Sequence, residues 1–171
     1  MLRALTRAFL SGLICCASLV PVQAQVLEQD VPWQNMQDWN IYQSRVYKGC
    51  VAVARYQDGT TVRLGYDGIT RGYFVNFSNP RWTGYEMLKN NELQFVLDGS
   101  RSFKGYFHMI ERDRLPTFET GGVNVSFLEA IAAANGFRIR EGNVQLAALS
   151  LSGSRRALNS MIECERARTG R

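Results

Sequence analysis

The chain contains a single histidine, and this scarcity excludes most of the catalytic centres that a protein of 171 residues can build. A Ser-His-Asp hydrolase would have to use His108, yet no G-x-S-x-G turn is present and the residues around His108 alternate like a strand. We expect His108 to be a partly exposed strand residue. Scattered carboxylates leave a small glycosidase-like hydrolase as an alternative, because their separation in space cannot be read from the sequence. The leading expectation is that the protein is not an enzyme.

Groups that bind metals, phosphates or nucleic acids are equally scarce. Four cysteines and one histidine form no cluster at metal-ligand spacing, and the 15 glycines stand mostly singly at turns. No metal or other cofactor is therefore expected. The 20 lysines and arginines oppose 15 acidic residues without the clustered basic face that nucleic-acid binding requires. The sequence predicts no nucleic-acid partner.

Long apolar runs are missing except at the N-terminus. Residues 1–24 carry two arginines, an apolar run over 8–20 and the Val22-x-Ala24 pair, which is the layout of a signal peptide. The run is too short to span a bilayer comfortably, and no later segment qualifies as a transmembrane anchor. We expect cleavage after Ala24 and a periplasmic or secreted protein.

Removal of the signal peptide would leave two cysteines, Cys50 and Cys164. In an oxidising compartment, two cysteines in one exported chain favour a disulfide. Two unpaired buried thiols are the alternative. The disulfide would attach the end of the chain to an early strand.

Strand patterns dominate the chain after residue 39. Cys50, Ala52 and Ala54 alternate with Val51 and Val53, which predicts a strand with two apolar faces. Asp58-Gly59 and Asp98-Gly99-Ser100 are typical of hairpin turns. The polar segment 25–38 is expected to be an extended arm. The expected strands are 39–42, 47–57, 60–67, 72–78, 92–99, 101–110, 137–141 and 144–152.

Two helices are expected in the C-terminal third. The Ser126-x-x-Glu129 spacing is that of a capping box, and Asn135-Gly136 ends the first helix. The second helix places Cys164 close to an apolar stripe made by Ala157, Leu158, Met161 and Ile162. We predict an α+β fold, mostly antiparallel, with about six to eight strands in a sandwich-like arrangement. Residues 39–171 would form a single disulfide-linked β-rich domain.

Four residues are candidates for binding. Arg81 and Trp82 follow a proline in a loop, where an arginine and an aromatic ring could stack on a sugar or anchor a protein. The alternative is that Trp82 folds back over the core. Arg155 and Arg156 begin the last helix, where they could hold an anion, or where the stem of Arg155 could simply cover the apolar stripe. We favour the structural interpretation in both cases.

Motifs near both ends of the expected domain resemble a known family. The strand Trp39-Asn40-Ile41 is soon followed by Cys50, and the turn Ser150-Leu151-Ser152-Gly153 precedes a helix with Ala157-Leu158. In these features the chain resembles the invasion-associated locus B family of exported alphaproteobacterial proteins. It departs from that pattern by having no cysteine between Cys50 and Cys164 and by having Ser154 in place of an aromatic residue. The resemblance implies a β-rich fold and interaction with the envelope or a host surface, and it supplies no catalytic residues.

The sequence therefore favours a non-catalytic interaction module that is periplasmic or secreted. Its expected partner is an envelope or host-surface protein. An alternative is an inhibitor or immunity protein that blocks a cell-wall enzyme with the Trp82 loop as a plug.

Overall fold

The computed structural model describes residues 30–98 and 101–170, so the expected signal peptide lies outside the described residues. Ten strands and two helices occupy this part of the chain. In chain order they are β1 (Asp30–Asn35), β2 (Asn40–Ser44), β3 (Gly49–Arg55), β4 (Thr61–Asp67), β5 (Gly72–Ser78), β6 (Asn90–Leu97), β7 (Arg101–Arg112), β8 (Leu115–Val123), α1 (Val125–Ala133), β9 (Gly136–Glu141), β10 (Val144–Ser150) and α2 (Ser154–Thr169).

All ten strands belong to one sheet with the order β1-β2-β3-β4-β5-β8-β7-β6-β9-β10. Every neighbouring pair is antiparallel. The α+β class and the two late helices are confirmed, whereas the expectation of six to eight strands in a sandwich is wrong. The count rises to ten because β1 and β8 form strands, and a single sheet results because β8 joins β5 to β7.

The two unexpected strands contain residues that usually end a strand. In β1 the register shifts between Pro32 and Gln34, and β1 lies at the edge of the sheet, where a missing N–H is tolerated. In β8 the register shifts beside Gly121, next to Gly122 with φ +67°. Pairing with neighbouring strands thus overrides the local signals of proline and glycine.

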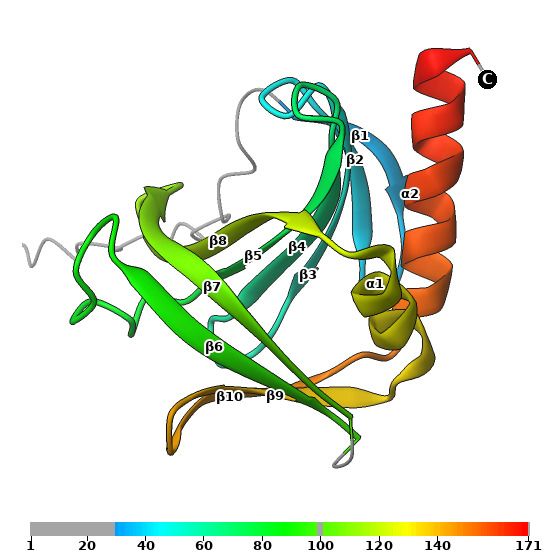
Figure 1. Ribbon diagram of the computed structural model, residues 1–171. Helices are drawn as coiled ribbons and strands as arrows, with labels where there is room; N and C mark the ends of the chain where they lie inside the picture. The colour runs from blue at the N-terminus through cyan, green and yellow to red at the C-terminus, as the bar shows by residue number, and fades with distance from the viewer. Residues whose placement is uncertain (1–29, 99–100, 171) are drawn as a thin grey trace, which may run out of the picture.

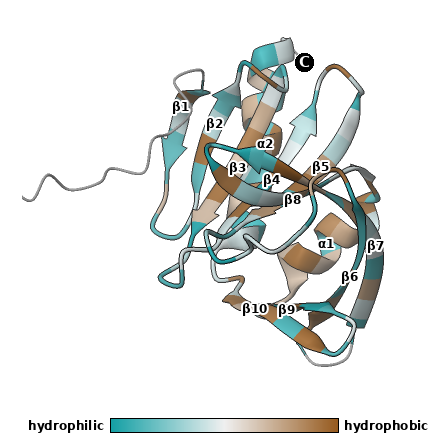
Figure 2. Cartoon of the chain, turned by 90° about the vertical axis from the view of Figure 1, so that its left-hand side faces the viewer, coloured by the Kyte–Doolittle hydropathy of each residue, from teal (hydrophilic) through white to brown (hydrophobic). Residues whose placement is uncertain are grey.

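The sheet bends around a single main core. Figure 1 shows β6, β9 and β10 lying across from β3, β4 and β5, with α1 at the open side between them. Aromatic rings of the two halves meet, since the ring centroid of Phe77 on β5 lies 5.2 Å from that of Phe95 on β6 and 5.8 Å from that of Phe137 on β9. Figure 2 shows α1 as largely hydrophobic where it faces this core.

The predicted alternation in β3 is confirmed. Cys50, Ala52 and Ala54 lie in the main core, whereas Val51 and Val53 belong to a small apolar cluster with Tyr42 and Phe74. The turn after β3 is the expected hairpin, and Gly59 there adopts φ +88°, a conformation that favours glycine.

Each helix departs from its predicted pattern at one position. The N-cap of α1 is Asn124, whose side chain accepts the N–H of Ser126 at 3.0 Å, so the expected cap at Ser126 is wrong. In α2 the side chain of Ile162 is 38% exposed and lies off the buried stripe, which Cys164 joins. Within residues 30–98 and 101–170, no helix is both long enough and apolar enough to cross a membrane.

The two cysteines attach α2 to β3. The sulfur atoms of Cys50 and Cys164 lie 2.00 Å apart, with the Cα atoms separated by 6.1 Å. The next residue after Cys164 adds a hydrogen bond, since a carboxylate oxygen of Glu165 accepts the backbone N–H of Cys50 at 3.2 Å. The C-terminal helix is therefore held by a covalent bond, a hydrogen bond and packing against β2 and β3.

Candidate functional site

The loop after β5 places Trp82 in the core. Its side chain is 6% exposed, and its ring centroid lies 5.2 Å from that of Phe118 on β8. The proposed plug at Trp82 is therefore wrong, because the ring is covered by the protein itself. The neighbouring Arg81 donates through its guanidinium to the carbonyl of Asp58 at 2.8 Å, which joins two loops.

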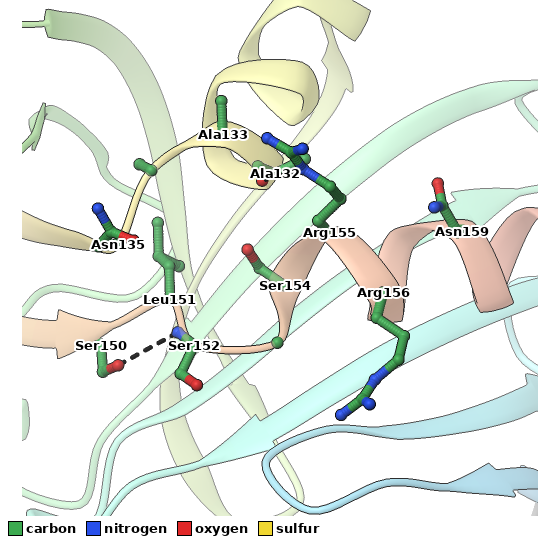
Figure 3. A pocket seen from close by; sticks show the side chains of 12 residues that line it. Ala132, Ala133, Asn135, Ser150, Leu151, Ser152, Ser154, Arg155, Arg156 and Asn159 are labelled. Atoms are coloured by element: carbon green, nitrogen blue, oxygen red, sulfur yellow. Dashed lines mark hydrogen bonds between the residues drawn. The ribbon is translucent and has the colours of Figure 1, made fainter.

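Arg155 and Arg156 line a depression of about 670 Å³ where α1 ends and α2 begins. Figure 3 shows Arg155 reaching toward the end of α1 while Arg156 points away from it. The Nε of Arg155 donates to the carbonyl of Ala132 at 3.2 Å, and the hydroxyl of Ser154 donates to the carbonyl of Ile131 at 3.0 Å. The two arginines do not converge on one ligand, and Arg155 places its charge at the negative end of α1.

The face of the sheet opposite the core carries a polar cluster that links the β7–β8 turn to β4 and β5. The hydroxyl of Tyr47 donates to Glu119 at 2.8 Å and accepts the Nδ2–H of Asn76 at 2.9 Å. Arg112 donates to the same Glu119 oxygen at 2.8 Å and lies 4.9 Å from the centre of the Tyr47 ring. Burial raises the pKa of Tyr47, so the phenol stays protonated and serves as a hydrogen-bond donor.

The charges of residues 111–114 alternate in sign, a pattern that is typical of a solvated strand end or loop, but Arg112 and Asp113 are largely covered in the structure. Asp113 pairs with Arg63 of β4, and both side chains are about nine-tenths buried. Desolvation lowers the pKa of Arg63, while Asp113 opposes that shift. Each charge in this cluster already has a partner of opposite sign, so the cluster is suited to holding strands together.

His108 is exposed on β7, as expected. Its register partners are Asn90 on β6 and Glu119 on β8. Because one oxygen of Glu119 is already engaged by Tyr47 and Arg112, this carboxylate belongs to the polar cluster. Among the described residues there is no group of three or more potential metal ligands.

The most distinctive cavity lies where β7 and β8 separate. The two strands pair from His108 with Glu119 to Arg112 with Leu115. The segment 101–107 of β7 instead follows β6, and the segment 120–123 of β8 follows β5. We call the space between these two segments the β7–β8 gap.

Aromatic side chains line the gap. Its volume is about 230 Å³, and its lining is mainly apolar. The ring centroid of Phe127 from α1 lies 5.2 Å from that of Phe103 and 5.5 Å from that of Phe95. Gly105, which stands between Phe103 and Phe107 on β7, makes room for the Phe107 ring, since a Cβ atom there would approach that ring to 3.2 Å. The remaining lining residues are Val75, Lys104, Thr120, Gly121, Gly122, Val123 and Asn124.

The gap is also bordered by strand edges. In an antiparallel ladder, alternate residues direct their N–H and C=O groups toward the paired strand and the others direct them away. In the part of the chain that the structure describes, no strand pairs with 101–107 or 120–123 on the side of the gap. The gap therefore offers apolar side chains together with backbone donors and acceptors.

Sequence reasoning did not find this site. The available signal was Gly105 in the middle of a strand, since an interior glycine often marks a close approach of another chain or ligand. Phe103 and Phe107 at alternate positions on either side of Gly105 added to it. The divergence of β7 from β8 depends on distant pairing and is not visible in a local pattern.

No family model and no curated protein match the chain. A solved structure does. The fold resembles that of invasion associated protein B from Bartonella henselae. The TM-score is 0.57 at 12% sequence identity, and the match covers 76% of this chain and 95% of that one. The distant resemblance read from the strand, turn and helix motifs is thus confirmed at the level of the fold.

Proposed function

We propose that the protein is a non-catalytic, exported binding module of the bacterial envelope, with the β7–β8 gap as its binding site. The observation that carries this proposal is the aromatic lining of a cavity bordered by unpaired strand edges. Export is supported by the signal-peptide layout of residues 1–24 and is consistent with the Cys50–Cys164 bond. The expected partner is an envelope or host-surface protein, in keeping with the name of the structural neighbour.

The chemistry of the gap suits binding. Phenylalanine rings contribute large apolar areas, and fully buried aromatic anchors dominate many protein interfaces. The lining contains one ionisable side chain, Lys104, which is exposed and pairs with Glu92 at 2.8 Å. The binding free energy of a partner would therefore come mainly from apolar burial and backbone hydrogen bonds.

The test is capture of partners from an envelope fraction by the full chain and two variants. Phe103→Ala removes a ring from the gap, whereas Tyr106→Ala is a matched control on the other face of the same strand, where the side chain is 65% exposed. We expect Phe103→Ala to weaken binding of the captured partner at least tenfold, which is about 1.4 kcal/mol. Tyr106→Ala should bind like the wild type.

Unchanged binding of the partner by Phe103→Ala, with the melting temperature preserved, would overturn the proposed site. Substrate turnover by the purified protein would overturn the non-catalytic proposal. Capture and inhibition of a cell-wall hydrolase would instead identify an inhibitor or immunity protein.

A further inference from the structure

We infer that the β7–β8 gap binds an extended peptide segment of its partner as an added β-strand. This inference rests on the proposed function and specifies the conformation and chemistry of the bound segment. It identifies the occupant as a strand with apolar side chains at alternate positions.

The backbone of the gap is the first reason. The segment 101–107 of β7 is paired with β6 on one side, and 120–123 of β8 is paired with β5 on one side. Their other sides face the gap with N–H and C=O groups that only another backbone can match in series. A purely apolar ligand would remove water from these groups without replacing its hydrogen bonds, which is costly.

The side chains supply the second reason. Phe103, Gly105 and Phe107 occupy alternate positions of β7, so they share the face that lines the gap. The two rings stand on either side of Gly105 with the period of two residues that an extended peptide also has. Alternate side chains of a bound strand would lie against these rings, and their neighbours would point away from them.

The free edges also predict the direction of the bound strand. The two edges are antiparallel to each other, so a strand between them is antiparallel to one and parallel to the other. The free edge of β7 is the longer, and antiparallel pairing is slightly more stable per residue. We assign the antiparallel pairing to β7.

The test uses the full chain and a synthetic probe, a fluorescent peptide of alternating valine and threonine flanked by lysines. Its partner probe has the same side chains but carries N-methyl groups on alternate residues, which removes half of its hydrogen-bond donors. We expect the N-methylated peptide to bind at least tenfold more weakly. Amide hydrogen exchange in 101–107 and 120–123 should slow when the unmodified peptide binds, and Phe103→Ala should bind it more weakly than Tyr106→Ala does.

Equal affinity for the two peptides, or no slowing of exchange in these segments, would overturn strand addition. Failure of the unmodified peptide to bind would do the same. These results would leave the proposed function intact as long as capture of the envelope partner still depends on Phe103. Loss of that dependence is the separate outcome that overturns the proposed function.

Discussion

The guanidinium of Arg63 on β4 lies 2.5 Å from the carboxylate of Asp113 in the β7–β8 turn, fifty residues further along the chain. Both side chains are about nine-tenths buried. Removing one partner of a buried pair leaves the other charge without compensation, so we expect Asp113→Ala to lower the free energy of unfolding by about 3–5 kcal/mol. Urea denaturation measures this change.

The exposed pair of Lys104 and Glu92 is the control for that prediction. Glu92→Gln should leave the unfolding midpoint nearly unchanged, because water and salt screen an exposed pair. Similar losses in Asp113→Ala and Glu92→Gln would show that burial does not set the importance of the Arg63–Asp113 contact.

The polar cluster shows how far sequence reasoning reaches. The alternating charges of residues 111–114 are typical of a solvated turn, and Glu111 and Arg114 are indeed exposed. Arg112 and Asp113 are instead largely covered, because Glu119 of the next strand and Arg63 of β4, fifty residues earlier, pair with them. The charge pattern of residues 111–114 alone does not indicate either partner.

Three half-buried tyrosines predict a loss of stability at alkaline pH. Burial raises the pKa of Tyr47 and of Tyr56, and burial followed by the hydrogen bond to Glu141 raises the pKa of Tyr85 to about 12. Folding therefore favours the neutral phenols. Their contribution is complete below the unfolded pKa of about 10 and is lost as the pH rises through the folded values.

We accordingly expect the free energy of unfolding to fall above about pH 10, where unfolded tyrosines ionise. Tyrosinate absorbance of these half-buried phenols should then appear together with the loss of circular dichroism. Tyr47→Phe should make the alkaline decline shallower. Full ionisation of all tyrosines in a folded chain near pH 10 would contradict this prediction.

The arginines at the start of α2 should differ in their effect on stability. Arg155→Glu breaks the hydrogen bond to Ala132 and puts a negative charge at the negative end of α1, so we expect a loss of about 0.3–1 kcal/mol. Arg156→Glu is the matched control one residue away, and it should be neutral or slightly stabilising. Thermal unfolding of the two variants tests this, and partner binding should be unchanged in both. Equal destabilisation by both variants would contradict a specific role for Arg155.

The disulfide should contribute strongly to stability. The two cysteines are 114 residues apart in sequence, and a loop of that size corresponds to about 4.7 kcal/mol in the chain-entropy model. We expect replacement of both cysteines by serine to lower the free energy of unfolding by as much as about 4.7 kcal/mol. The mass of the intact protein should be lower by two hydrogens than that of the reduced chain. Free alkylation of both thiols without reduction would show that the bond is not formed.

Local patterns predicted the elements that local residues determine. The two faces of β3 and the turn at Asp58-Gly59 follow from alternation and from the conformational freedom of glycine. The strand β8 was missed because Pro116, Gly121 and Gly122 usually end strands, yet here they lie in a strand that pairs on both sides. The gap was missed for the related reason that it arises from the choice of strand partners.

The bond between Cys50 and Cys164 also changes what a single cut in the backbone can do. It closes the chain between these residues into a ring that contains most of the sheet, α1 and the β7–β8 gap. Cleavage of one peptide bond in any exposed turn of that ring opens it but releases no fragment. Both pieces stay in one molecule until the disulfide is reduced, so a protein nicked once within the ring keeps all the strands that form its candidate binding site.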